Sequence, residues 1–513
     1  MNLFAEATFG LQDAFAAIFS SPQALLLVAT GTALGIVVGA IPGLTGAMLI
    51  TLTLPLTFGM QQPADAMVLL ISMYVGSISG GLITATVLRM PGTPASIMTT
   101  LDGYPLAQRD PGRALGLGMT ASFVGGLISW IFLWLLAGVM ADLSTKLTPF
   151  NLFALVLMAL ALMATVSGDS LTRGLLSGLL GILTALPGQS PATGELRLTF
   201  GIGELNDGLK LLPVLIGLFA VSQVIHELLR GDSVDEVLQD ATAASVSQSP
   251  RGLFMSFADW RQQSANMLRS SLIGTWVGIL PGIGANIGSV LAYSAARWSS
   301  KTPEKFGTGA ESGIVASEAA NNATVGGALI PLIAIGIPGS VIDAILLGAL
   351  VIHGLQPGPL LFRDSPDVVQ TIIATMLLAN VFMFIFMMLS VRWLIRLVNI
   401  PREFLLPAIL VFCVVGSFGL GNRMFDVWVM LAFGLFGFGL EMLKVPLAPF
   451  VIGFVLAPIA EEKLGAGLML SNGSYRPLMT EPISALLTLL AAVILCVPLW
   501  SRLRQRMASR QDV

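Results

Sequence analysis

Hydroxyl and amide side chains follow four Pro-Gly pairs in this chain of 513 residues, and each pair interrupts a long apolar stretch. Proline and glycine end one helix, and a Thr, Ser or Asn placed soon after them caps the start of the next. A helix start presents free N–H groups and the positive end of its dipole, so it attracts anions. The four interruptions and their capping residues are Pro42-Gly43 with Thr45, Pro91-Gly92 with Thr93, Pro281-Gly282 with Asn286, and Pro338-Gly339 with Ser340.

The clearest of these helix starts is Thr93-Pro94, where Thr93 serves as the N-cap and proline takes the first helical position. Ser340 holds the corresponding place in the second half, and the spacing of Ser340 and Asp343 is that of a capping box. The alternative is that the Pro-Gly pairs are kinks that only let helices pack closely. One pair alone favours that alternative, whereas two matched pairs favour a binding site.

A site built from these helix starts predicts which residues contact the anion. Arg89, just before the second Pro-Gly pair, has two interpretations. Its guanidinium binds a carboxylate of the ligand, or its long side chain reaches the polar surface from the end of a helix. The predicted anion-binding residues are Gly43, Thr45, Gly46, Arg89, Gly92, Thr93, Ser96, Gly282, Gly284, Asn286, Gly339 and Ser340.

A second polar group has side chains suited to a cation. Glu318, Asn321 and Asn322 lie three and four positions apart, so they share one face of a helix. Carboxylate and amide oxygens suit Na⁺, and a carboxyl that takes up a proton suits H⁺. With Asp343 they form the predicted cation-coupling set, which is also the candidate Na⁺ site. The alternative is structural: the three form hydrogen bonds at a helix end, and Asp343 only caps its helix.

The elements that position these residues are membrane helices. The chain is 55% hydrophobic and 11% charged, whereas soluble proteins carry about 25% charged residues. Apolar runs such as 371–389 and 483–500 reach the roughly 20 residues that cross a bilayer. We therefore expect an all-α, polytopic bundle of about 10–12 spans, with helices broken or re-entrant at the Pro-Gly pairs. In lipid, broken backbone must border protein or a water-filled cavity.

The order of the motifs predicts two internal repeats. Each half carries a Pro-Gly pair, then Gly-Gly at 80–81 or 326–327, and then two further Pro-Gly pairs. We expect one permease domain over 1–513, with repeat one at about 20–230 and repeat two at about 264–480. A polar linker at 231–263, which carries four acidic residues before residue 241, joins them. The pattern leaves open whether the repeats are inverted or parallel.

Basic residues predict the orientation. The tail 501–513 carries Arg502, Arg504, Arg506 and Arg510, which the positive-inside rule places in the cytoplasm. Spans near 482–500, 446–460, 425–441 and 404–420 then return the chain to the same side, where Arg392, Arg396 and Arg402 lie. No Lys or Arg precedes Arg89, so a cleavable signal peptide is not expected.

The sequence lacks the motifs that several other functions require. There is no Gly-Lys dipeptide, so there is no P-loop for ATP. No H-E-x-x-H or G-x-S-x-G motif occurs, and Cys413 and Cys496 lie far apart in apolar segments. We therefore expect a transport protein and neither an enzyme nor a nucleic-acid-binding protein, with no cofactor beyond a coupling ion, Na⁺ or H⁺. An intramembrane enzyme is the alternative from a different class, and it lacks a nucleophile or metal constellation.

At these motifs the chain resembles the large transmembrane subunit (TctA type) of the tripartite tricarboxylate transporter family. The first half carries Gly-Ala-Ile-Pro-Gly-Leu-Thr-Gly at 39–46, Pro-Gly-Thr-Pro-Ala-Ser at 91–96 and Leu-Asp-Gly-Tyr-Pro, a suspected turn, at 101–105. The second half carries Leu-Pro-Gly-Ile-Gly-Ala at 280–285, Phe-Gly-Thr-Gly at 306–309, Glu-Ala-Ala-Asn-Asn-Ala at 318–323, Gly-Ile-Pro-Gly-Ser at 336–340 and Ile-His-Gly-Leu-Gln-Pro-Gly-Pro at 352–359.

The resemblance implies a permease in the cytoplasmic (inner) membrane of a bacterium, crossing it many times. It implies import of organic carboxylates, related to tricarboxylates or dicarboxylates, by symport with a cation. The implied partners are a small four-helix membrane subunit and a periplasmic solute-binding protein that delivers the substrate. The alternative within transport is a carrier of carboxylates or other small anions that needs no binding protein.

Overall fold

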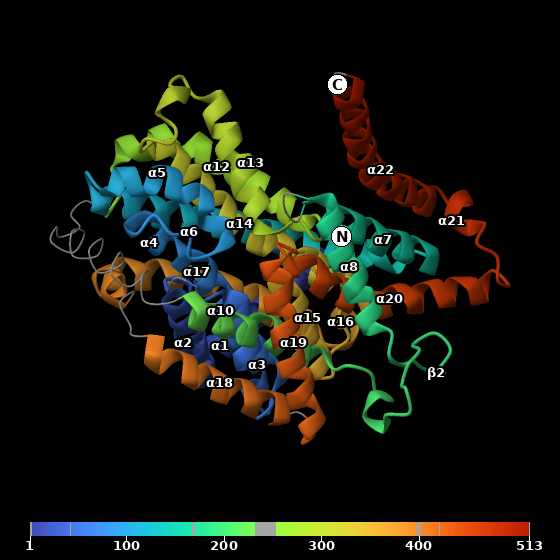
Figure 1. Ribbon diagram of the computed structural model, residues 1–513. Helices are drawn as coiled ribbons and strands as arrows, with labels where there is room; N and C mark the ends of the chain where they lie inside the picture. Colours follow the sequence, from blue (N-terminus) through green and yellow to red (C-terminus); the bar gives the residue numbers. More distant parts are fainter. Residues whose placement is uncertain are drawn as a thin grey trace.

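The fold is almost entirely helical in the part of the chain that the computed structural model describes, residues 3–41, 43–166, 170–230, 253–397, 402–419 and 421–511. Strand is confined there to one antiparallel hairpin, β1 (Gly188–Gln189) paired with β2 (Leu196–Arg197). Figure 1 shows the helices gathered into one body, with α22 (Pro482–Gln511) standing out beside it. The expected all-α, polytopic fold class is confirmed.

The helices of the first half follow the predicted breaks. Helix α2 ends at Gly39, before the first Pro-Gly pair, and α3 starts after it, at Gly46. The elements in order are α1 (Leu3–Ser20), α2 (Pro22–Gly39), α3 (Gly46–Thr57), α4 (Pro63–Val87), η1 (Pro94–Ser96), α5 (Ile97–Ala107), α6 (Pro111–Thr145), α7 (Pro149–Val166), α8 (Leu171–Ala185), η2 (Gly203–Leu205), α9 (Leu211–Leu215), the π-helical turn η3 (Ile216–Val221) and α10 (Ser222–Arg230).

The second half follows the same plan. Helix α12 ends before the third Pro-Gly pair and α13 begins after it. The elements are α12 (Phe257–Ile279), α13 (Gly284–Ser299), η4 (Pro303–Lys305), α14 (Glu311–Ile335), α15 (Val341–Ile352), α16 (Pro359–Asp364), α17 (Pro366–Leu397), α18 (Arg402–Gly419), α19 (Met424–Met442), α20 (Leu447–Leu470), α21 (Pro477–Thr480) and α22.

Two pairs of helices that hold corresponding places in the two halves have equal lengths. Helices α4 and α14, which follow α3 and α13 in their halves, both have 25 residues. Helices α7 and α18, further along, both have 18. Long helices of equal length in the same order fit the two-repeat interpretation, which stays a prediction about the origin of the chain.

Six helices in the described part are long and apolar enough to cross a membrane: α2, α4, α6, the segment from α9 to α10, α17 and α19. Shorter apolar helices accompany them, among them α3 and α15, which start after Pro-Gly pairs. Helix α4 is enclosed by protein over its whole apolar stretch, so it forms the centre of the body. The structure is therefore that of a multi-pass membrane protein.

Small residues bring the paired helices together in the same way in each half. A Cβ at Gly39 of α2 would collide with the backbone of Ser77 in α4. A Cβ at Gly278 of α12 would lie 2.5 Å from the Thr324 carbonyl oxygen in α14. In lipid there is no hydrophobic drive between helices, so such close backbone approach supplies the packing energy.

The halves are intertwined. Helix α6 of the first half packs against α14 of the second, and α17 of the second packs against α4 of the first. Helix α8 packs against α20, while α19 packs against η3 and α10. Because each half completes its core with helices of the other, we expect neither to fold alone.

The observed helices test the boundaries that the sequence predicts for the C-terminal spans and for the linker. Helices α18, α19, α20 and α22 occur at the four spans predicted for the C-terminal region. Within the predicted linker, 231–252 lie outside the described residues, and Phe257–Gln263 is helical as the start of α12. Pro42 also lies outside the described residues, as do the side chains of the basic tail, whose orientation stays a prediction.

Candidate functional site

The helix starts after the four Pro-Gly pairs meet at one cavity of about 640 Å³. Helices α3, α13 and α15 contribute their first residues, and η1 contributes the turn that begins at Thr93. A cavity of this size is in the range of small-molecule sites, about 300–1,000 Å³. Of the predicted anion-binding residues, those that line it are Thr45, Gly46, Thr93, Gly282, Gly284, Asn286 and Ser340.

Two of the predicted caps form as expected. The Thr45 hydroxyl accepts a hydrogen bond of 3.2 Å from the Met48 N–H at the start of α3. The Ser340 hydroxyl accepts one of 3.3 Å from the Asp343 N–H at the start of α15. These caps are determined by contacts within one helical turn, and so the sequence predicts them well.

Thr93 is the N-cap of η1 and Pro94 is its first residue, as predicted, and the Ser96 side chain closes this turn. The Ser96 hydroxyl accepts a 3.2 Å hydrogen bond from the Thr93 N–H and donates a 2.8 Å hydrogen bond back to the Thr93 carbonyl. The Thr93 hydroxyl is buried without a hydrogen-bond partner in the described part of the chain, and Thr93 lines the cavity. Thr93 therefore has a free polar group where a ligand would lie.

The prediction that Asn286 caps its helix is wrong. The N-cap of α13 is Ile283, three residues earlier, and the helix begins at Gly284, because Gly282 and Gly284 adopt positive φ angles of 79° and 73° and turn the chain sharply. Asn286 is the third residue of the helix, and it still lines the cavity. The glycines, which tolerate this backbone conformation, set the helix start.

The other predicted anion-binding residues do not line the cavity. Arg89 is exposed, with φ of 56°, and its guanidinium carbon lies 5.8 Å from the centre of the Tyr104 ring. Its contact with Tyr104 fits the interpretation in which Arg89 reaches the surface. The remaining four, Gly43, Gly92, Ser96 and Gly339, lie in the turns and close contacts behind the helix starts.

Several cavity residues have no counterpart in the sequence prediction. Tyr74 and Ser77 come from the middle of α4, where they look like ordinary membrane-helix residues. Two basic residues, Arg173 at the start of α8 and Lys444 after α19, also line the cavity. No local motif marks them, because only the packing of α8 and α19 around the helix starts brings them there.

Glu318 is fully buried between the two halves. Its carboxylate accepts hydrogen bonds from the hydroxyls of Thr99 in α5, at 2.5 Å, and Ser122 in α6, at 3.1 Å. The Asn322 side chain accepts one of 2.7 Å from Ser79 in α4, whereas both polar atoms of the Asn321 side chain are buried without a partner among the described residues.

Asp343 lies in different surroundings. It is fully buried at the start of α15, beside Ser340 and the Tyr74 hydroxyl, which themselves lie 3.4 Å apart. Neither oxygen of its carboxylate accepts a hydrogen bond from the described residues. No hydrogen bond joins Asp343 to Glu318, Asn321 or Asn322 in the described part of the chain. The four cation-side candidates thus fall into two groups.

Asp102 belongs to helix α5, so the turn suspected there is wrong. Its carboxylate accepts four hydrogen bonds from the second half: three from the N–H groups of Gly307, Gly309 and Ala310, at 2.8–2.9 Å, and one from the Tyr293 hydroxyl at 2.8 Å. Asp102 therefore links α5 to the loop before α14. Because Thr99 is also in α5, this link helps to keep the Thr99 hydroxyl next to Glu318.

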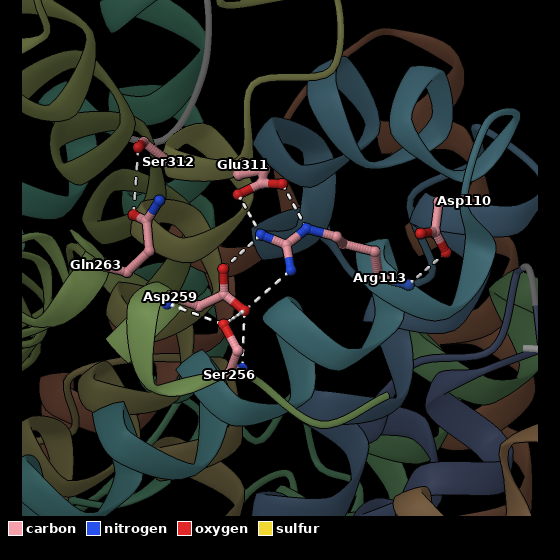
Figure 2. Close-up of polar contacts among 7 residues, drawn as sticks. All are labelled: Asp110, Arg113, Ser256, Asp259, Gln263, Glu311 and Ser312. Atoms are coloured by element: carbon pink, nitrogen blue, oxygen red, sulfur yellow. Dashed lines mark hydrogen bonds and ion pairs between the residues drawn. The ribbon is translucent and has the colours of Figure 1, made fainter. Parts of the chain in front are cut away.

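A second link between the two halves is an ion-pair cluster at the start of α6. The Arg113 guanidinium donates to both oxygens of Asp259, at 2.7 and 3.0 Å, and to both oxygens of Glu311, at 2.5 and 2.8 Å. Figure 2 shows Arg113 reaching between these carboxylates, which come from the starts of α12 and α14. Three helix starts from both halves are thereby held together.

A family model and one relative match this chain over most of its length, and a second relative matches less than half of it. A family model described as the tripartite tricarboxylate transporter TctA family matches residues 25–452. A protein of Agrobacterium vitis, described as an uncharacterized 52.8 kDa protein in the TAR-I ttuC' 3' region, is 31% identical over 499 residues, which are 97% of this chain and 96% of that protein. A second A. vitis protein, described as uncharacterized in the TAR-II ttuC' 3' region, is 34% identical over 224 residues, 44% of this chain and 92% of that protein.

No solved structure matches the chain. The family match covers most of both halves of the chain, from α2 to the first residues of α20, and therefore includes every helix start at the cavity. The resemblance at the Pro-Gly motifs is confirmed by this match. The chain is a member of the TctA family, the membrane component of the tripartite tricarboxylate transporters.

Proposed function

We propose that this protein imports organic carboxylates across the cytoplasmic membrane of a bacterium by symport with Na⁺ or H⁺. It receives its substrate from a periplasmic solute-binding protein and works with a small four-helix membrane subunit. Its C-terminus lies in the cytoplasm, and it uses no cofactor besides the coupling ion. Family membership supports a role in a tripartite system, and the cavity supports the substrate class.

The observation that carries the proposal is the meeting of helix starts from both halves at one cavity. A carboxylate placed there accepts hydrogen bonds from free N–H groups and lies at positive dipole ends. Thr45 and Ser340 are each occupied in capping their helix, while Thr93 has a free hydroxyl. The site therefore holds an anion largely through backbone groups, which fits carboxylates of varied skeleton.

Asp343 is the stronger candidate for the coupling residue. Its carboxylate is buried, forms no close hydrogen bond with the described residues, and lies three positions after Ser340, which lines the cavity. An uncompensated buried carboxylate is costly unless it takes up a cation or a proton. Glu318 is a second candidate, and its hydrogen bonds with Thr99 and Ser122 make a structural role an equal alternative.

The test is uptake by proteoliposomes that contain this chain, the small subunit and the binding protein loaded with a radiolabelled carboxylate. We expect uptake that requires an inward gradient of Na⁺ or of protons and stops when the gradient is collapsed. Vesicles with this chain alone are the control. If vesicles with this chain alone take up the carboxylate as fast as the complete system, the tripartite proposal is contradicted and a carrier that needs no binding protein is favoured.

A further inference from the structure

Two basic side chains at the cavity have no acidic partner in the described part of the chain. Arg173, in the first turn of α8, and Lys444, in the turn after α19, line the cavity and take part in none of the ion pairs or side-chain hydrogen bonds of the described residues. Both residues are exposed, so they lie on the open side of the cavity. The buried part of the lining forms its inner wall, with Gly46 at the start of α3, Thr93 at the start of η1, and Ser77 of α4.

The charges around the cavity favour an anion. Among the described residues that line it, Arg173 and Lys444 are basic and Glu441 is acidic, so positive side chains outnumber negative ones. Charged side chains in membrane proteins face water-filled cavities or pathways and mark substrate routes. A guanidinium binds a carboxylate with two parallel hydrogen bonds, and an ammonium adds a mobile positive charge.

We propose that Arg173 and Lys444 form a second anion-binding position at the opening of the cavity, which selects substrates that carry at least two anionic groups. One carboxylate binds at the helix starts on the inner wall, and the other binds the two basic side chains. This inference rests on the proposed carboxylate transport and names the residues that decide which carboxylates are taken. The cavity volume of about 640 Å³ has room for a diacid placed between the two positions.

The test measures binding to the purified full-length protein in detergent, in complex with its small subunit. The probes are three diacids, succinate, glutarate and terephthalate, each compared with its monomethyl ester, which keeps the carbon skeleton and loses one charge. Affinity is obtained from the ligand-dependent shift of the melting temperature. The variants are Arg173→Gln, Lys444→Gln and the double variant, with Arg89→Gln as the matched control because Arg89 is exposed and lies away from the cavity lining.

We expect the wild-type protein to bind at least one diacid about tenfold more tightly than its monoester. The double variant should bind the diacid and its monoester about equally tightly, because the diacid loses affinity and the monoester does not. Arg89→Gln keeps the wild-type preference. A double variant that keeps the full preference would overturn the inference while leaving carboxylate transport standing. Failure of the wild-type protein to bind any of the six compounds would count against both the inference and the proposed function.

Discussion

The Thr99 hydroxyl, in the first half of the chain, donates a 2.5 Å hydrogen bond to the Glu318 carboxylate in the second half. Ser122 donates to the other oxygen of the same carboxylate at 3.1 Å, and Ser317 lies 2.9 Å from the Thr99 hydroxyl. The spacing of polar residues on α14 predicts that Glu318 and its neighbours share a face. The structure adds that this face is held by hydroxyls from α5 and α6.

Glu318→Gln tests whether this carboxylate couples the cation or only joins helices. The amide has the same shape, so we expect a folded, membrane-inserted protein whose cation-driven uptake falls at least tenfold if the carboxylate itself is needed. Uptake in proteoliposomes, together with the melting temperature, measures the two effects. Glu462→Gln, at an exposed position, is the control. Normal uptake by Glu318→Gln would assign Glu318 a structural role.

Asp343→Asn tests the stronger coupling candidate. The substitution removes a buried charge that forms no close hydrogen bond with the described residues, so the variant is expected to be as stable as the wild-type protein or more stable. Uptake should lose its dependence on the cation gradient and fall at least tenfold. Measuring the initial rate of uptake at several Na⁺ concentrations and at several proton gradients identifies the ion. The control is Asp367→Asn, at the exposed start of α17, which should behave as the wild type. An unchanged cation dependence in Asp343→Asn would show that Asp343 is not the coupling residue.

Gly278→Ala tests the close contact between α12 and α14. The new methyl group would lie 2.5 Å from the Thr324 carbonyl oxygen and 2.9 Å from the Ala328 nitrogen, so the helices must move apart. We expect a loss of about 1–3 kcal/mol in the free energy of unfolding, as for other overpacked sites. Thermal denaturation in detergent measures it. Gly138→Ala in α6 is the matched control, because a Cβ there meets nothing within 4 Å.

Asp259→Asn tests the ion pair between Arg113 of α6 and Asp259 of α12. Asp259 lies in α12, outside the six long apolar helices, and the Arg113 guanidinium holds the pKa of its carboxyl below the usual value of 3.8. A lowered pKa in the folded state adds stability above pH 4 or so, and this stability is lost as the pH falls through the folded pKa. We expect the variant to lose roughly 1–3 kcal/mol at neutral pH, since a hydrogen bond to a charged group is removed.

The pH profile of this loss separates a charge effect from a packing effect. Melting temperatures of the wild-type protein and of Asp259→Asn should converge as the pH is lowered below about 4, because Asp259 then takes up a proton in the unfolded chain and, at still lower pH, in the folded protein. A gap that stays constant across this range would contradict the charge effect. Asp364→Asn, which removes an ion pair between exposed side chains with Arg363, should leave the melting temperature unchanged at neutral pH.

The sequence by itself determined the features that arise within a few turns of the chain. The apolar runs predict a helical membrane protein, and the Pro-Gly pairs predict where helices stop and restart. Thr45 and Ser340 are found as caps because a cap depends on a partner three residues away. The cap of α13 lies three residues before the predicted Asn286, because the glycines at positive φ already turn the chain into the helix there.

Only the tertiary structure decided which residues share the cavity. Arg89 stands next to a Pro-Gly pair in sequence and lies outside the cavity lining, whereas Arg173 and Lys444 have no motif and lie within it. The partners of Glu318 come from α5 and α6, about two hundred residues earlier in the chain. Contacts across such distances depend on how helices of the two halves pack against each other, and a local pattern of residue types carries no record of that packing.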